Sequence, residues 1–187
     1  MTPAEKLLLA QRYVNQAQQA IAEAAGNSDP YARTESRKVL REHVQAAREV
    51  LAVLEREHPE VIAPFVTDEG TDTLLSVAML RMWAYCVEAE VMARCYQDWS
   101  TARDLAESAV SIDPEVAHPH ALVAWFAAEG GDFQAAIAAM ERAVSLEPDN
   151  LLFKQALNDA RRDAERAAAP QETITIKSIW DPKSWLG

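Results

Sequence analysis

The hydrophobic positions in the first third of the chain recur with the period of an α-helix. A first stripe, spaced alternately by three and four residues, comprises Leu7, Ala10, Val14, Ala17, Ile21 and Ala24. A second stripe with the same kind of spacing comprises Leu40, Val44, Ala47, Leu51 and Leu54. Each stripe predicts one apolar helix face, and Gly26 and Asn27 mark the end of the first helix. We therefore expect residues 1–66 to form a helical hairpin and a connector, with the two stripes buried against each other.

Two short segments follow this hairpin before the helical pattern returns. Residues 61–66 are apolar and predict a connector, whereas residues 67–73 are polar, contain Gly70 and predict a loop. Beyond this loop the pattern predicts four helices, over residues 73–96, 101–112, 118–129 and 133–146.

The segment from residue 98 to residue 114 is repeated 34 residues later. Seven positions correspond without a gap: Asp98/Asp132, Trp99/Phe133, Ala102/Ala136, Ala109/Ala143, Val110/Val144, Ser111/Ser145 and Pro114/Pro148. The alanines suit places where two helices approach closely, and the prolines end a helix because they cannot continue it. The sequence thus predicts two stacked helix pairs that share one apolar interior.

A 34-residue unit of helix, tight turn and helix, closed by proline, resembles the tetratricopeptide repeat. The resemblance implies an all-α array over residues 71–166, ending in a capping helix that opens at Leu151 and becomes charged toward its end. At a constant 34-residue offset, the large aromatic position of each first helix falls on Cys86 and His120. The small position falls on Glu90 and Ala124, so the first helix of the first copy departs most from the family pattern.

The resemblance also implies a peptide-binding groove, because the first helix of each unit lines the concave face in this family. The positions that correspond are Val87, Val91, Arg94, His118, Ala121, Leu122, Trp125 and Glu129. For Leu122 and Trp125, burial between helices is the alternative interpretation. Some members clamp a terminal carboxylate with cationic side chains, but Arg94 alone is cationic here. We expect an apolar protein or peptide partner with basic flanks, steered by carboxylates at the rim.

Residues 170–187 form a tail unlike the rest of the chain. Its first part is rich in β-branched residues and partly alternating, which predicts an extended segment. The apolar side chains expected to dock on protein are Ile174, Ile176, Trp180 and Trp185. They would lie either on their own chain or on a neighbouring protomer, the latter giving a homodimer. Membrane contact is less favoured because Lys177 and Lys183 are the only cations of the tail.

Charge and composition narrow the classes of partner. The net charge is −11, and residues 71–150 hold four Arg, no Lys and thirteen Asp or Glu. Nucleic acid is not an expected partner, since phosphate contacts need clustered cations. No apolar run reaches the length of a membrane span, so we expect no integral membrane association. The chain opens into an amphipathic helix without a signal-peptide pattern, which favours the cytoplasm. Cys86 and Cys95 lie nine residues apart and would face opposite sides of one helix, as unpaired thiols.

The sequence contains no motif that indicates catalysis or a cofactor. It lacks a Gly-x-Ser-x-Gly elbow, a His-Glu-x-x-His helix and a phosphate-binding glycine loop. His118 and His120 would diverge on a helix, which disfavours a shared metal ion. We therefore expect a non-catalytic interaction module, an adaptor or chaperone-like scaffold. One alternative is a self-assembling structural protein whose tail docks on its own or a neighbouring protomer. Another is a regulatory subunit of an enzyme on another chain.

Overall fold

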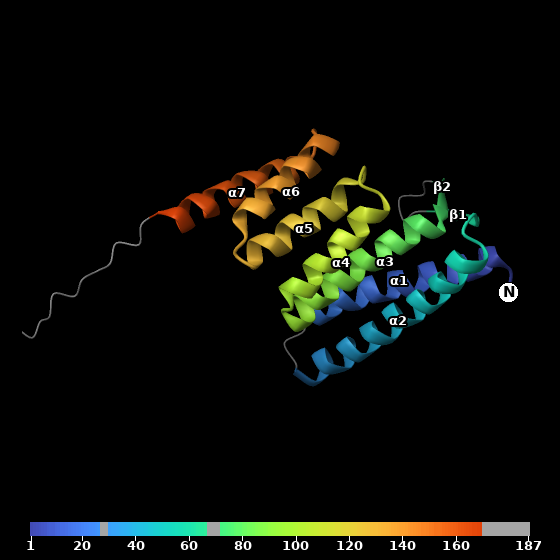
Figure 1. Cartoon of the computed structure of the whole chain (residues 1–187). Coiled ribbons are helices and arrows are strands. Elements are labelled where there is room, and N and C mark those ends of the chain that lie inside the picture. The colour runs from blue at the N-terminus through green and yellow to red at the C-terminus, as the bar shows by residue number, and fades with distance from the viewer. Residues whose placement is uncertain (27–29, 67–71, 170–187) are drawn as a thin grey trace, which may run out of the picture.

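The computed structural model describes residues 1–26, 30–66 and 72–169, and these residues form an all-α array with one β-hairpin (Figure 1). The helices are α1 (Pro3–Gly26), α2 (Pro30–Glu57), α3 (Val77–Val91), α4 (Trp99–Ile112), α5 (Ala117–Glu129), α6 (Phe133–Leu146) and α7 (Leu151–Ala168). A π-helical turn, η1 (Met92–Tyr96), extends α3. Each helix packs on the next along the chain, which confirms the predicted all-α helical array. None of the described helices is long and apolar enough to cross a membrane.

Helices α1 and α2 form the predicted N-terminal hairpin. Their stripes meet in one hydrophobic cluster, in which Leu7, Leu40 and Leu54 are fully buried. The same cluster contains Val87 and Val91 of α3, so the hairpin covers one side of the repeat region. The helical hairpin therefore lies at the N-terminal side of the repeat region, in contact with α3.

A two-stranded antiparallel sheet joins the helical hairpin to the repeats. The pattern of the sequence did not predict this sheet. β1 (Ile62–Val66) pairs with β2 (Asp72–Ser76), with Ala63 opposite Leu75. Both of these side chains are buried, and β1 packs against α1. The expected start of a helix at residue 73 is therefore wrong: α3 begins at Val77. Residues 67–71 of the predicted loop lie outside the described residues.

The start of α3 is fixed by a local hydrogen bond. Ser76 has an extended backbone, and its hydroxyl accepts a hydrogen bond from the backbone N–H of Met79 at 3.1 Å. This is the geometry of an N-terminal helix cap, which satisfies one of the free N–H groups of the first turn. Residues 73–76 pair with β1 instead of extending the helix backward.

The two copies of the repeat have the same local structure from the turn onward. Asp98 and Asp132 cap α4 and α6 and accept hydrogen bonds from the N–H groups of Thr101 and Ala135, each at 3.1 Å. The four repeated alanines are all 0 % exposed: Ala102, Ala109, Ala136 and Ala143. The repeated alanines are therefore buried in both copies, as expected for positions between packed helices.

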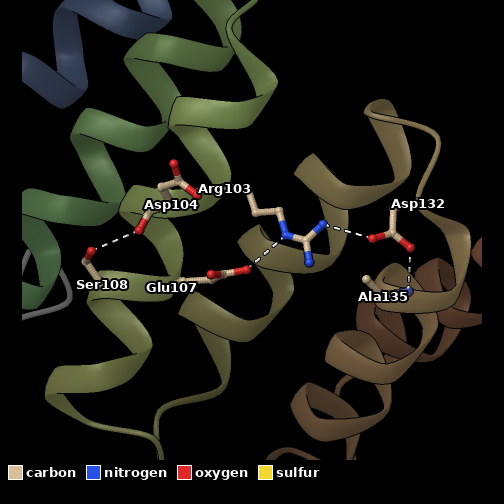
Figure 2. A network of polar contacts seen from close by, with 6 residues as sticks. All are labelled: Arg103, Asp104, Glu107, Ser108, Asp132 and Ala135. Atoms are coloured by element: carbon tan, nitrogen blue, oxygen red, sulfur yellow. Dashed lines mark hydrogen bonds and ion pairs between the residues drawn. The ribbon is translucent and has the colours of Figure 1, made fainter.

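One arginine links the two copies at the surface. Arg103 on α4 donates to Glu107 on its own helix at 2.9 Å and to Asp132 at 3.0 Å (Figure 2). The hydrogen bond from the Ala135 N–H, followed by the bond from Arg103, holds the pKa of Asp132 below its usual value. The side chain that starts α6 is thus tied to α4 of the preceding unit. An exposed ion pair of this kind contributes little to the free energy of unfolding. The packing of the two copies on each other therefore depends mainly on the buried alanines.

The π-helical turn η1 changes the register of the first copy. In the second copy α5 ends with hydrogen bonds from the Gly131 N–H to Ala128 O (2.9 Å) and from the Asp132 N–H to Ala127 O (2.8 Å). The corresponding bonds in the first copy, from Gln97 to Ala93 and from Asp98 to Met92 (both 3.1 Å), each span one residue more. The first copy therefore holds one extra residue in this turn, as is typical of π-bulges.

The extra residue changes the offset between α3 and α5 from 34 to 35. At the new offset the pairs buried in both copies include Ala89/Ala124, Val87/Leu122 and Val91/Phe126. The pairs half-buried in both copies include Trp83/His118, Tyr85/His120 and Glu90/Trp125. Equivalence at a constant 34-residue offset, which assigned Cys86 and Glu90 to these positions, is therefore wrong for this helix. The residues that take their places are Tyr85 and Ala89.

Substitutions in the two turns should change stability in opposite directions. Gln97 and Gly131 are equivalent and have positive φ angles of 55° and 81°. This region costs a residue other than glycine about 1 kcal/mol. We expect Gln97→Gly to raise the free energy of unfolding by up to about 1 kcal/mol and Gly131→Ala to lower it by about as much. Apart from Gly131 and its two chain neighbours, no atom lies within 4 Å of a Cβ placed on Gly131, so the loss would come from the backbone conformation. Urea unfolding of both variants measures this, and equal stability of Gly131→Ala and the parent would contradict it.

Candidate functional site

The structure divides the eight predicted groove residues into two sets. Val87 and Val91 are 2 % and 5 % exposed and pack in the cluster formed with α1 and α2. Leu122 is buried between α3, α4 and α5, and Ala121 is half-buried against the cluster of α6 and α7. The expectation that Val87 and Val91 are exposed is wrong, and for Leu122 the alternative interpretation, burial between helices, is the one that the structure shows. Their side chains complete the helix packing.

The other four predicted residues lie together on one surface. His118 and Trp125 are seven residues apart on α5, so they project from the same side of the helix and are both half-buried. Glu129 follows one turn later and is exposed, as is Arg94 of η1. We call the surface formed by Trp83, Glu90, Arg94, His118, Trp125 and Glu129 the Trp125 face.

Aromatic contacts join α3 to α5 across the Trp125 face. The rings of Trp83 and His118 stack with centroids 5.3 Å apart. Trp125 makes an edge contact with Trp99 at 6.3 Å and a tilted contact with Phe126 at 4.8 Å. Trp125 is therefore held from behind by two aromatic rings, while part of its surface remains open to solvent.

Charged groups surround these rings. The guanidinium carbon of Arg94 lies 4.8 Å from the centroid of the Trp125 ring, within the range of a cation–π interaction. Arg94 Nε also donates to a Glu90 carboxylate oxygen at 3.2 Å. The indole N–H of Trp125 approaches Glu129 at 3.4 Å. Two carboxylates and one arginine thus surround a tryptophan, an arrangement that can hold a cationic side chain.

Sequence reasoning missed Trp83 and Glu90 as members of this face. At a 34-residue offset Glu90 aligned with a small core residue and Trp83 aligned with Ala117, which is buried. A one-residue gap between residues 92 and 96 would have aligned Trp83 with His118 and Glu90 with Trp125. The signal in the sequence that could have revealed this gap is the recurrence of alanine at positions 89 and 124, both of which are buried in the structure.

The pKa of His118 is lowered because burial disfavours the imidazolium, although the carboxylates of Glu90 and Glu147 act in the opposite direction. Below a pH of about 6.5, which is the ordinary pKa of histidine, His118 binds a proton more readily in the unfolded chain than in the folded protein. Stability should therefore fall as the pH is lowered from about 6.5 through the folded-state pKa.

The pH dependence of stability tests this effect through a variant that keeps an aromatic ring. His118→Phe retains a ring that can stack on Trp83 and removes the titrating group. We expect the parent protein to lose more stability than His118→Phe between pH 7.5 and pH 5.5, measured by urea unfolding. The other histidines are common to both proteins, so parallel pH profiles would contradict the prediction.

A concave site lies between α2 and α3, with a cavity of about 140 Å³. Two ion pairs cross it, Arg48 with Glu88 at 2.9 Å and Arg81 with Glu55. Burial raises the pKa of Glu88, and Arg48 opposes that shift. Because each arginine here is matched by a glutamate, the cleft is charge-balanced, and its residues serve to join the two helices.

The two thiols are poorly suited to nucleophilic chemistry. Burial, followed by the charge of Glu90, raises the pKa of Cys86 to about 12. Burial also raises the pKa of Cys95, against the influence of Arg37. Both cysteines are free and lie in separate hydrophobic clusters, which agrees with the expectation that they face opposite sides of the helix. Among the described residues, no group of three His, Cys, Asp or Glu side chains is placed to hold a metal ion.

Comparisons with known proteins assign the chain to no family. The chain matches no known protein-family model, and a search of curated proteins finds no matching relative.

Proposed function

We propose that this protein is a non-catalytic interaction module of the tetratricopeptide-repeat type, an adaptor or chaperone-like scaffold that binds a partner peptide on the Trp125 face. The repeated aspartate caps, the repeated buried alanines and the packing of each helix on the next support a repeat array of this type. The observation that carries the proposal is Trp125 itself. A half-exposed indole held by two rings and flanked by carboxylates resembles the anchor sites of protein interfaces.

The chemistry of the face favours a peptide with an apolar centre and basic flanks. Trp83 and Trp125 offer apolar contact area that gains free energy on burial. Glu90 and Glu129 lie beside them, and Glu147 acts electrostatically on His118 at the same face. A lysine or arginine of the partner would meet these carboxylates, and Arg94 would be displaced from Trp125 or share its ring.

Selection of peptides from a displayed random library tests the proposal. We expect the selected sequences to combine apolar residues with lysine or arginine. Glu129→Lys should weaken their binding about tenfold, because it replaces an exposed carboxylate beside Trp125 with a cation that repels the basic flanks of the peptide. Trp125→Ala should weaken it by a larger factor, as is usual for an aromatic anchor.

The matched control is Asp104→Lys, which makes the same change of charge at an exposed position of α4, outside the Trp125 face. Circular dichroism of each variant checks that the helices are retained. If no peptide is selected, or if the selected peptides bind Glu129→Lys and Asp104→Lys equally well, the proposal is refuted.

A further inference from the structure

The β-hairpin carries an exposed apolar side. Leu74 is 64 % exposed and Ile62 is 54 % exposed, and Pro64, which pairs with Leu74, is also exposed. Side chains alternate across a strand, so these three residues share the outward side, while Ala63 and Leu75 face α1. An exposed apolar side next to an unpaired strand edge offers a surface on which another segment of chain can dock.

The two edges of this sheet differ in their ability to accept another strand. Proline has no N–H to donate, so Pro64 is suited to a position whose backbone groups point away from the partner strand. In an antiparallel ladder its partner Leu74 then also directs its N–H and C=O outward. Pro64 blocks pairing along the edge of β1, whereas the edge of β2 keeps both its donor and its acceptor. Within the described residues, β2 is paired only with β1.

We propose that β2 accepts residues 173–180 of a second copy of this chain as a third strand. In an extended conformation Ile174, Ile176 and Trp180 share one side with Ser178. Thr173, Thr175 and Lys177 share the other side with Ile179. Added to the edge of β2, the apolar set would continue the side formed by Ile62, Pro64 and Leu74. Strand addition of this kind gains main-chain hydrogen bonds as well as side-chain burial.

The length of the chain rules out its own hairpin as the acceptor. The hairpin lies at the start of α3, and α7 ends at the opposite end of the array (Figure 1). Four helix-to-helix steps of about 8–10 Å each separate α3 from α7. The length of α7 adds about 27 Å at 1.5 Å per residue. The residues between Ala169 and Ile174 span at most about 17 Å, so only a neighbouring copy can receive the strand.

Each copy then carries one donor strand and one acceptor edge on different surfaces. Such an interface is heterologous, and repeated addition gives a ring or an open chain of copies. This inference is independent of peptide binding by the Trp125 face, because it uses neither α5 nor the residues of that face.

The test measures particle mass by light scattering after gel filtration, over a range of protein concentrations. We expect the full chain to exceed its monomer mass of 20.7 kDa. The double variant Ile174→Asp, Ile176→Asp and the single variant Leu74→Asp should each return the mass to that of the monomer. Leu74 is largely exposed, so its replacement should leave the fold intact. Thr175→Lys, on the polar side of the same segment, should retain the assembly.

Mixing the two monomeric variants gives the decisive result. The Leu74→Asp variant keeps a tail that can act as the donor strand. The double variant keeps a β2 edge that can accept it. Together they should form a complex of about twice the monomer mass and no larger species. A mixture that stays monomeric, or a full chain that is monomeric at every concentration, would overturn the proposal.

A competing site for the tail exists on its own chain. Leu151 and Leu152, at the start of α7, are each 75 % exposed. About eight residues in an extended conformation would span the length of α7, so the tail could run back along this helix to its start. Docking there predicts a monomer whose Ile174→Asp, Ile176→Asp variant shows no change of mass. A mass that responds to Leu152→Asp and not to Leu74→Asp would equally reject the hairpin as the acceptor.

Discussion

Replacing Phe126 by alanine is expected to lower the free energy of unfolding by about 3–5 kcal/mol. Phe126 is 1 % exposed and heads the largest fully buried side chains of the described residues. It lies in the cluster formed by α3, α4 and α5. The loss should be near the upper end of this range because many of its neighbours are alanines, whose short side chains cannot move in to refill a cavity.

Urea unfolding followed by circular dichroism measures this loss. Leu151→Ala is the matched control, because it also removes a large apolar side chain, but from a position that is 75 % exposed. It should change stability by no more than about 0.5 kcal/mol. A loss below about 1 kcal/mol for Phe126→Ala would show that the described cluster is not the core of the protein.

Replacing Ala136 by leucine is expected to cost about 1–3 kcal/mol or more, although it adds apolar surface. Ala136 is fully buried on α6, which packs on α5 and α7. A larger side chain must push neighbouring helices apart, because a packed interior has little free volume. The displacement should also reduce cooperativity between the two copies and broaden the unfolding transition.

Ala138→Leu is the control for this substitution, since it makes the same chemical change on the same helix at an exposed position. It should leave stability nearly unchanged, because leucine and alanine are both good helix formers. Equal losses in the two variants would mean that the repeated alanines are not where the helices meet.

Most of the helices could be predicted because their signals are local. The expected helix over residues 133–146 coincides with α6, and the expected helix over residues 118–129 differs from α5 by one residue. Gly26, the aspartate caps and the prolines end or begin helices through backbone effects that depend on a few neighbouring residues. The stripes of residues 7–24 and 40–54 predicted correctly that α1 and α2 pack together.

The β-hairpin could not be predicted because neither strand is stable alone. Residues 62–66 are short and apolar, a pattern shared by connectors and buried strands. Residues 73–76 lead directly into a helix, so the helical pattern was extended backward through them. Pairing across the intervening segment and packing of Ala63 and Leu75 toward α1 determine the strands, and both are contacts between distant parts of the chain.

The structure brings together only part of the candidate site. Arg94, His118, Trp125 and Glu129 lie near one another on one surface, but Val87, Val91 and Leu122 are buried. The extra residue of η1 explains the error at Val91, because the residue equivalent to Trp125 is Glu90 and not Val91. Val87 and Leu122 are equivalent at the corrected offset, and both are buried between helices.

The sequence by itself determined that this chain forms repeated helix pairs with alanine at their contacts, because capping, helix termination and apolar periodicity act between residues close in the chain. The tertiary structure alone decided the register of α3 relative to α5 and the formation of the β-hairpin by β1 and β2. A π-helical turn differs from an α-helical one by a single hydrogen-bond step, so packing against neighbouring helices selects it. That selection buries Val87 and Val91 against α1 and α2, and it leaves Trp83, Glu90 and Arg94 beside Trp125.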